Sequence, residues 1–289
     1  MPELPEVERS RRLIERVAAG HRIERVTCAR DAIVFDRVSP SRVRHALAGR
    51  TIVAVHRRGK HLWLELDQRP WPCFHLGMTG DILARGWTPP RLNSTPRVET
   101  KAWPPRFTKI HLVIDTGAEL AMTNKRRLGR IRLRDDPARE LPIARLGFDP
   151  LLDLPSPQRF VGVLGNRSAV IKALLLDQTF AAGVGNWIAD EVLYQARIDP
   201  RRRANALSAA EARRLRSKLK QIIETAVLVD ADKSFFPRDW LFHQRWGRKR
   251  GATIDGKPIE FLTVGGRTTA WVPTVQRQRA SVTSEEADS

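Results

Sequence analysis

Residues 182–191 read Ala-Gly-Val-Gly-Asn-Trp-Ile-Ala-Asp-Glu, and this stretch decides how the second half of the chain folds. A helical segment ends before it, the two glycines allow a tight turn, and Asn186 is predicted to cap the helix that follows. Glycines let a phosphate approach the backbone, and a helix N-terminus offers free N–H groups and positive potential. The pattern predicts either an ordinary helical hairpin or a phosphate site that uses Gly183, Gly185 and Asn186.

Downstream of this turn, helical periodicity gives way to short strands. Residues 208–211 (Ser-Ala-Ala-Glu) form a capping box before a long helix. The apolar stripe of that helix consists of Leu215, Leu219, Ile222 and Ala226. The stretches 254–257 (Ile-Asp-Gly-Lys) and 264–267 (Val-Gly-Gly-Arg) indicate turns between β-rich pieces, which predicts a small hairpin lobe.

Upstream of the turn, the sequence predicts an antiparallel β domain that begins with one helix. The helix is expected over 6–18, with Gly20 as its stop. Strands are expected at 22–28, 51–56, 61–66, 109–115, 119–123 and 131–133. Thr116-Gly117 lies between two of these strands and is a hairpin signal. Two packed sheets with the first helix against them are therefore expected.

Taken together, these patterns place the chain in the α+β class. Residues 85–106 are rich in Pro, Arg and Thr and are predicted to form a long loop. The expected divisions are a β domain at 1–134, a proline-rich linker at 135–160, a helical domain at 161–250, a hairpin lobe at 251–275 and a frayed tail at 276–289.

The charge balance points to a polyanionic partner. The 289 residues include 51 Lys and Arg against 32 Asp and Glu, for a net charge of +19, and nucleic acid is the usual partner of such an excess. No apolar run approaches the ~18 residues of a membrane span, and the N-terminus lacks a secretory signal. Cys28 and Cys73 lie in strand-like segments and are expected to be buried, reduced thiols.

The chain starts Met-Pro-Glu-Leu-Pro-Glu-Val-Glu. If Met1 is removed, Pro2 carries a free secondary amine, which can form a charged iminium with a carbonyl-like carbon. Bonds beta to that cation break easily, and Glu3 could shuttle protons beside it. The same residues also suit a disordered start whose backbone is limited by prolines.

Two basic turns add candidate anion contacts. Lys60 lies in the Arg-Arg-Gly-Lys-His turn at 57–61, and Arg267 lies in the Gly-Gly-Arg-Thr-Thr turn at 265–269. A lysine can hold a phosphate or protonate a leaving group, and an arginine offers a bidentate fork. In isolation, each turn also fits an ordinary exposed loop.

Two further loops carry candidate wedge residues for a DNA duplex. Residues 75–80 read His-Leu-Gly-Met-Thr-Gly, and residues 124–129 read Asn-Lys-Arg-Arg-Leu-Gly. Exposed Met78, Arg126 and Leu128 could fill the gap left by an extruded base. The alternative is that Met78 and Leu128 belong to the core.

Two motifs together resemble one known family. The Pro-Glu-Leu-Pro-Glu-Val-Glu start and the Gly-Val-Gly-Asn turn before a helix resemble the formamidopyrimidine-DNA glycosylase / endonuclease VIII family. The stretches 185–198 and 261–273 resemble its plant-and-fungal branch, and the similarity runs from Pro2 to about Pro273.

The resemblance implies a bifunctional DNA glycosylase and AP lyase of base excision repair. Expected substrates are formamidopyrimidines, 8-oxoguanine and its further oxidation products in double-stranded DNA, and abasic sites. The implied fold is a β-sandwich, a helical domain with a helix-two-turn-helix, and a finger hairpin. Since no cysteine follows Cys73, the finger is expected to be zincless and to rely on packing by Phe261 and Trp271.

The resemblance also implies roles for single residues. Pro2 is similar to the nucleophile, Glu3 to the acid/base that opens the sugar, and Lys60 to the lysine that contacts phosphate and assists elimination. Asn186 and Arg267 resemble the pair that grips phosphates around the flipped nucleotide. Met78 and Arg126 resemble residues that fill the gap left by the extruded base, and Leu128 takes a third such position. Leu128 departs from the phenylalanine common in bacterial members, which leaves the opposite-base preference open.

The resemblance also implies the reaction products, the oligomeric state and the cellular localisation. Beta and then delta elimination would leave a one-nucleotide gap with phosphate ends. Two opposing effects act on the pKa of the Pro2 amine, because basic surroundings lower it and the neighbouring Glu3 raises it, and the balance stays open from the sequence. The resemblance implies a monomer without cofactor or metal that is intracellular with the DNA, in the nucleus of a eukaryote or the nucleoid of a bacterium.

Two other classes of function stay open from the sequence. One is a DNA-binding protein that kept the scaffold without catalysis. The other is an RNA-binding or ribosome-associated basic protein.

Overall fold

The computed structural model describes residues 2–88, 90, 92, 102–248 and 250–276. The chain divides into two compact units. The first unit comprises Met1–Leu154, Asp177–Gly185 and Lys220–Pro237, and the second comprises Pro155–Leu176, Asn186–Leu219 and Arg238–Ser289. Half of the loop expected at 85–106 and nearly all of the tail expected at 276–289 lie outside the described residues.

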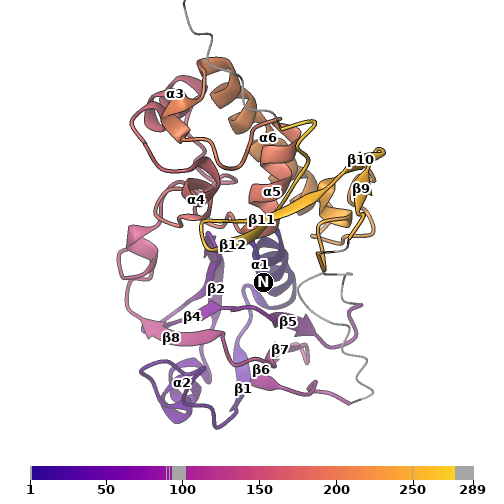
Figure 1. Ribbon diagram of the computed structural model, residues 1–289. Coiled ribbons are helices and arrows are strands. Elements are labelled where there is room, and N and C mark those ends of the chain that lie inside the picture. The colour runs from indigo at the N-terminus through magenta and orange to yellow at the C-terminus, as the bar shows by residue number, and fades with distance from the viewer. Residues whose placement is uncertain (1, 89, 91, 93–101, 249, 277–289) are drawn as a thin grey trace, which may run out of the picture. The chain divides into compact units, whose positions relative to one another are not determined.

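Two four-stranded antiparallel sheets form the first unit (Figure 1). One sheet has the order β2-β3-β4-β8, from β2 (Ile52–Arg58), β3 (His61–Leu66), β4 (Trp71–His75) and β8 (Arg130–Arg134). The other has the order β1-β6-β7-β5, from β1 (Ile23–Cys28), β6 (Thr108–Ile114), β7 (Glu119–Asn124) and β5 (Gly80–Ala84). The predicted antiparallel domain is confirmed.

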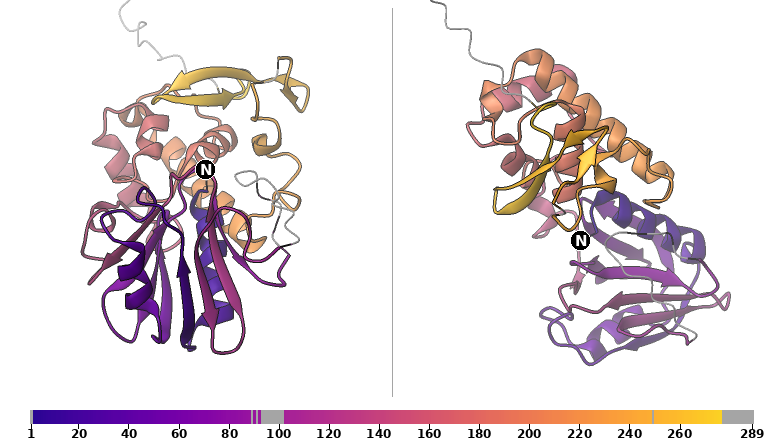
Figure 2. Two further views of the ribbon diagram at one scale, coloured as in Figure 1. Left: turned by 90° about the horizontal axis from the view of Figure 1, so that it is seen from below. Right: turned by 45° about the vertical axis from the view of Figure 1, so that its right-hand side comes forward.

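One core joins both sheets and two helices of this unit. Figure 2 shows α1 (Leu4–Ala18) beside the strands. Val7 and Ile14 of α1 pack in the same buried cluster as Ile52 and Leu64 of one sheet and Leu112 of the other. Burial of this apolar surface provides the main stabilisation of the unit and fixes where the start of α1 lies.

The first helix begins earlier than its periodicity indicates. Glu3 and Glu6 form a capping box, in which each side chain accepts a hydrogen bond from the other residue's backbone, so the helix starts at Leu4 instead of residue 6. The sequence analysis missed α2 (Pro40–Leu47), whose signal is Ser39 before Pro40. The Ser39 hydroxyl accepts the Arg42 N–H at 3.1 Å, as an N-cap does.

The second unit is helical. Its helices are α3 (Pro157–Gly165), α4 (Ile171–Leu176), α5 (Asn186–Gln195) and the first half of α6 (Ala209–Leu228), whose second half belongs to the first unit. The capping box before α6 is confirmed: Glu211 N–H donates to Ser208 Oγ at 3.3 Å, and Ser208 N–H donates to Glu211 Oε2 at 2.8 Å. Short 3-10 helices occur at η1 (Ile143–Arg145), η2 (Ala204–Ala206) and η3 (Leu241–His243).

The predicted hairpin lobe is confirmed as two small hairpins. They are β9 (Thr253–Ile254) with β10 (Lys257–Pro258), and β11 (Glu260–Val264) with β12 (Arg267–Trp271). Phe261 packs on a buried cluster that includes Leu241 and Val272, while Trp271 lies under the Arg201 guanidinium at 4.5 Å. Apolar and cation–π contacts therefore hold this lobe.

Two features are absent from the described residues. No helix there is long and apolar enough to cross a bilayer. No group of three or more His, Cys, Asp or Glu in the described ranges is placed to hold a metal ion.

Candidate active site and nucleic-acid interface

The start of the chain packs on the glycine turn within the first unit. Leu4 N–H donates to the Gly183 carbonyl at 3.1 Å. A Cβ on Gly183, whose φ is +90°, would lie 2.8 Å from Leu4 Cβ, and a Cβ on Gly185 would lie 2.6 Å from Glu3 Cγ. Glycine is required at both positions because the N-terminal segment comes this close, a reason that the sequence pattern did not reveal.

Lys60 reaches the same turn from the β2–β3 connection. It is 7 % exposed, and its Nζ donates to the Val184 carbonyl at 3.0 Å. Gly59 allows this approach, since a Cβ there would lie 3.0 Å from Gly183 N. The alternative of an exposed basic turn is therefore excluded for Lys60. The fold brings Glu3 and Lys60, two of the predicted catalytic residues, to one glycine turn.

Gln178 organises this turn and was missed by the sequence analysis. Its Nε2 donates to the Val184 carbonyl at 2.8 Å, and its Oε1 accepts the Gly183 N–H at 3.0 Å. Val184 thus accepts from both Gln178 and Lys60. The Lys60 bond joins residues 124 positions apart, so spacing alone could not predict it. Gln178 is separated from the two turn residues that it bonds by only five and six positions, so its signal was local and was overlooked.

A buried ion network supports the β2–β3 turn. Arg57 donates through Nε to Glu8 Oε2 at 2.8 Å and through Nη1 to Asp149 Oδ2 at 2.5 Å. Asp149 also accepts the Gly59 N–H at 2.7 Å. Burial alone would raise the pKa of Glu8, but the hydrogen bonds and positive charges of Arg57 and Arg11 together outweigh burial and lower that pKa. The network holds Gly59, and with it Lys60, against the glycine turn.

Glu6 adds a second acidic group beside Glu3. Its Oε2 accepts the Glu3 N–H at 3.0 Å, and the residue is 5 % exposed. Burial, helped by the nearby Glu3 carboxylate, raises the pKa of Glu6 to about 7. A carboxyl group that exchanges its proton near neutral pH therefore lies next to the predicted acid/base.

Asn186 and Arg267 are found together in the second unit. Asn186 is the first residue of α5, and its Nδ2 donates to the Thr268 carbonyl at 2.8 Å, one residue from the exposed Arg267. The prediction that the Asn186 side chain caps α5 is wrong. The amide turns toward β12 instead, and its Oδ1 is buried without a hydrogen-bond partner among the described residues.

Further cations surround Thr268. Arg248 donates to Thr268 Oγ1 at 2.5 Å, and Lys172 Nζ lies 3.3 Å from the Thr268 carbonyl. Asp190 pairs with Lys172 at 2.5 Å and with Arg245 at 2.6 Å. The neighbourhood of Thr268 thus holds more positive than negative charge, which suits a phosphate.

The predicted wedge residues lie on the surface of the first unit. Met78 is 37 % exposed and Leu128 is 41 % exposed, and Arg126 is also exposed. The alternative that Met78 and Leu128 belong to the core is therefore excluded. Their two loops touch, because Arg126 N–H donates to Thr79 Oγ1 at 3.4 Å.

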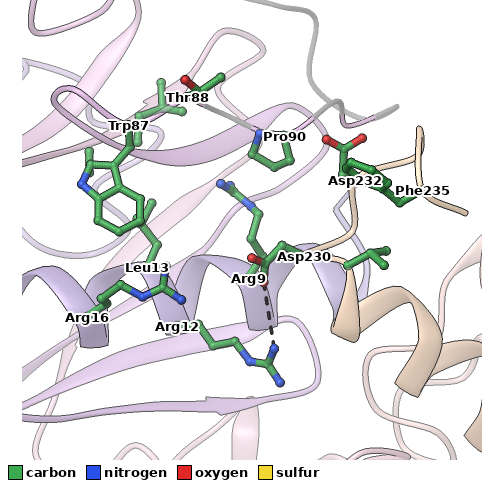
Figure 3. A pocket seen from close by; sticks show the side chains of 13 residues that line it. Arg9, Arg12, Leu13, Arg16, Trp87, Thr88, Pro90, Asp230, Asp232 and Phe235 are labelled. Carbon is green, nitrogen blue, oxygen red and sulfur yellow. Dashed lines mark ion pairs between the residues drawn. The ribbon is translucent and has the colours of Figure 1, made fainter.

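A separate pocket of about 290 Å³ lies on the outer face of α1 and contains none of the predicted site residues (Figure 3). Arg12 and Arg16 of α1 line it with Trp87 and Asp230. The Arg16 guanidinium lies 5.3 Å from the Trp87 ring centre, and Arg12 pairs with Asp230 at 4.0 Å.

The fold and these contacts describe a basic α+β protein in which the N-terminal segment and the buried Lys60 meet at one glycine turn. Three family models match nearly the whole chain. They are the formamidopyrimidine-DNA glycosylase N-terminal domain over 1–131, its H2TH domain over 146–237, and the formamidopyrimidine-DNA glycosylase-like C-terminal domain over 240–273.

Individual relatives agree with these models. A formamidopyrimidine-DNA glycosylase of Arabidopsis thaliana is 45 % identical over 277 residues, which cover 96 % of this chain and 71 % of the relative. A protein of the same name from Thermus thermophilus is 37 % identical over 291 residues, which cover 96 % of this chain and 98 % of the relative.

Solved structures of the Lactococcus lactis enzyme match the same fold. One, bound non-covalently to DNA containing an AP site, has a TM-score of 0.77 and is 25 % identical over 96 % of this chain and 100 % of its own. Another, in complex with DNA containing FAPY-dG, has a TM-score of 0.76 at the same identity and coverage. The chain belongs to the formamidopyrimidine-DNA glycosylase family and is, by this relationship, a DNA glycosylase with AP lyase activity.

Proposed function

We propose that this chain excises oxidised bases from duplex DNA through the amine of Pro2 and cuts the strand at the same site. The substrates are formamidopyrimidines, 8-oxoguanine with its further oxidation products, and abasic sites. The observation that carries the proposal is the convergence of Glu3 and Leu4, which directly follow Pro2 in the chain, with Lys60 on the Gly183–Gly185 turn. The Lactococcus lactis complexes with AP-site and FAPY-dG DNA support this substrate class.

The reaction begins when the neutral Pro2 nitrogen attacks C1′ of the damaged nucleotide and the base leaves with a proton. Glu3 protonates O4′ as the sugar ring opens, which leaves an iminium on Pro2. Removal of a C2′ proton then expels the 3′ phosphate by beta elimination, and delta elimination expels the 5′ phosphate. Water finally releases the sugar remnant and restores the amine.

Lys60 and Glu6 assist this sequence through charge and protons. The Lys60 ammonium, 3.0 Å from the Val184 carbonyl, supplies a buried positive charge for a departing phosphate. Glu6, whose pKa is raised to about 7 by burial, exchanges a proton near neutral pH beside Glu3. Proline supplies the electron sink itself, so the reaction requires no cofactor.

Binding of the duplex involves the other predicted residues. Asn186 and Arg267 contact backbone phosphates, aided by the positive surroundings of Thr268. Gly183 and Gly185 let a phosphate approach the turn from the side away from the N-terminal segment. Met78, Arg126 and Leu128 fill the space that the extruded nucleotide leaves.

We further propose that the chain belongs to the plant-and-fungal branch with a zincless finger. The 45 % identity to the Arabidopsis thaliana relative supports this, as does the lack of any cysteine after Cys73 in the sequence. The protein acts as a monomer on DNA, in the nucleus of a eukaryote or the nucleoid of a bacterium. Its domains are 1–134 for catalysis, 135–160 as linker, 161–250 as helical domain, 251–275 as finger and 276–289 as tail.

Borohydride trapping on abasic-site DNA tests the role of Pro2. Wild type should cross-link covalently, whereas a variant extended before Pro2 should not, because the extension turns the amine into an amide. Both proteins should bind the same duplex. Failure of the wild type to cross-link would favour the alternative of a DNA-binding protein without catalysis, and cross-linking by the extended variant would move the nucleophile elsewhere.

A further inference from the structure

The two wedge loops are neighbouring crossovers between the two sheets. Leu76–Thr79 connects β4 to β5, and Lys125–Gly129 connects β7 to β8. Because β4 pairs with β8 and β5 pairs with β7, both crossovers leave one sheet and enter the other at the same end of the sandwich. Strand pairing places the loops side by side but does not fix their separation.

Asn124 joins the two crossovers. It is fully buried at the end of β7, where it pairs with Gly80 of β5. Its Nδ2 donates to the Leu76 carbonyl of the first crossover at 2.8 Å, and its Oδ1 accepts the Gly129 N–H of the second at 3.2 Å. One side-chain amide thus bonds the backbone of both loops.

Three glycines leave the room that this contact needs. A Cβ on Gly77 would lie 2.6 Å from Gly129 N, and its φ of +64° already disfavours other residues. A Cβ on Gly80 or on Gly129 would lie 2.6 Å from Asn124 Nδ2. No larger residue fits at these positions without moving one crossover away from the other.

We propose that Asn124 is a positioning residue for base extrusion. It sets the separation of Met78 on the first crossover from Arg126 and Leu128 on the second. This inference rests on the proposed function, since it matters only if these side chains enter the duplex. Asn124 touches neither the reacting sugar nor the amine, so its effect passes through the wedge.

The physical reason is pre-organisation. A wedge that is rigid before binding loses little conformational entropy when it enters the base stack. Without the Asn124 amide, the buried Gly129 N–H loses its acceptor, while the Leu76 carbonyl keeps the Gly80 N–H at 2.9 Å. The first crossover therefore keeps its own turn, and what is lost is the buried amide connection to the second crossover. The longer bond from Arg126 N–H to Thr79 Oγ1, at 3.4 Å near the exposed tips, remains as a hydrogen bond between the loops.

This mechanism predicts a selective defect. Excision from a duplex needs the wedge, because the damaged base must be unstacked and the gap filled. Schiff-base formation on a preformed abasic site in single-stranded DNA needs neither. Loss of the Asn124 bonds between the two crossovers should slow excision from a duplex and spare Schiff-base formation on single-stranded abasic DNA.

Asn124→Ala tests this with two substrates. In single-turnover assays, excision of 8-oxoguanine from a duplex should fall roughly 10- to 100-fold, since misplacement by about 1 Å can cost about 100-fold. Borohydride trapping on single-stranded abasic DNA should stay within about twofold of wild type. Met78→Ala, which removes a wedge residue directly, should show the same selectivity, and Asn205→Ala, at an exposed amide, should show no defect.

Gly77→Ala is an independent second variant, because its added Cβ separates the crossovers without altering the amide. It should reproduce the selective defect, and the double variant should be little worse than either single one. An equal loss on both substrates, or unchanged duplex excision in folded Asn124→Ala, would overturn the proposal. A wild type that traps no abasic DNA would instead contradict the proposed function.

Discussion

The glycine turn of the first unit and the surroundings of Thr268 in the second unit are built on different physical principles. Around Gly183–Gly185, backbone groups and one buried lysine make the contacts, and the chains approach so closely that only glycine leaves enough room. Around Thr268, they are cations that outnumber the carboxylate Asp190. Bond making requires sub-ångström placement, whereas attraction of a phosphate tolerates longer and variable distances. Changes in shape should therefore damage the first region, and changes in charge the second.

The largest expected effect comes from Gly185→Ala. The added methyl group would overlap the Glu3 side chain and displace it from the turn. Excision and trapping should both fall roughly 100-fold, as expected for a displaced catalytic group. DNA affinity at low salt should change little. Gly162→Ala is the matched control because a Cβ there meets nothing within 4 Å. Full activity of Gly185→Ala would show that the close approach of Glu3 is dispensable.

A smaller effect is expected from the proton on Glu6. Its pKa is about 7 in the folded chain against an ordinary 4.5, so burial favours the neutral form. The associated stability is complete below pH 4.5, declines as pH rises through this window, and is lost above pH 7, for a total of at most about 3 kcal/mol.

Thermal denaturation between pH 5 and 8 tests this expectation. The Tm of wild type relative to Glu6→Gln should fall as the pH rises, because glutamine keeps an acceptor for the Glu3 N–H without titrating. Comparison with this variant is needed because burial also raises the pKa of Glu191 to about 7. Parallel pH curves for the two proteins would contradict the assignment.

The smallest effect, and the one confined to charge, is expected from Arg267→Ala. Loss of one phosphate contact should reduce the magnitude of the slope of log K against log salt concentration by roughly 0.9. Binding at low salt should be weaker than that of wild type. Trapping at saturating DNA should be unaffected. Arg139→Ala is a suitable control, because that exposed arginine already pairs with Asp136. An unchanged slope would remove Arg267 from the phosphate contacts.

Local patterns in the sequence predicted much of the fold. Alternation, helical spacing and turn residues indicated six strands of the two sheets, though not β4 and β5, together with the capping box at Ser208 and the terminal hairpins, since each depends on residues a few positions apart. The missed helix at Pro40–Leu47 had a local signal as well, in Ser39 and Pro40. The patterns did not indicate which helix end has a side-chain cap, and the Asn186 amide turned out to bond Thr268.

The site was predicted less completely, because several of its contacts join residues that are far apart in the sequence. Lys60, Glu3 and the glycine turn were recognisable as motifs, but Asn124 acts through a bond to the Leu76 carbonyl, which only the fold brings near. Gln178 bonds groups only five and six residues away and had a local signal that was overlooked. The Glu6 pKa depends on burial, which composition does not report. Solvent exposure, which the sequence also does not report, excluded a core position for Met78 and Leu128.

The two thiols of the chain have a consequence for an enzyme that repairs oxidative lesions. Burial raises the pKa of Cys28 to about 11 and that of Cys73 to about 12. Peroxide attacks the thiolate form, which is scarce at neutral pH for both residues. The two thiols should therefore stay reduced under the same oxidant exposure that creates the enzyme's substrates.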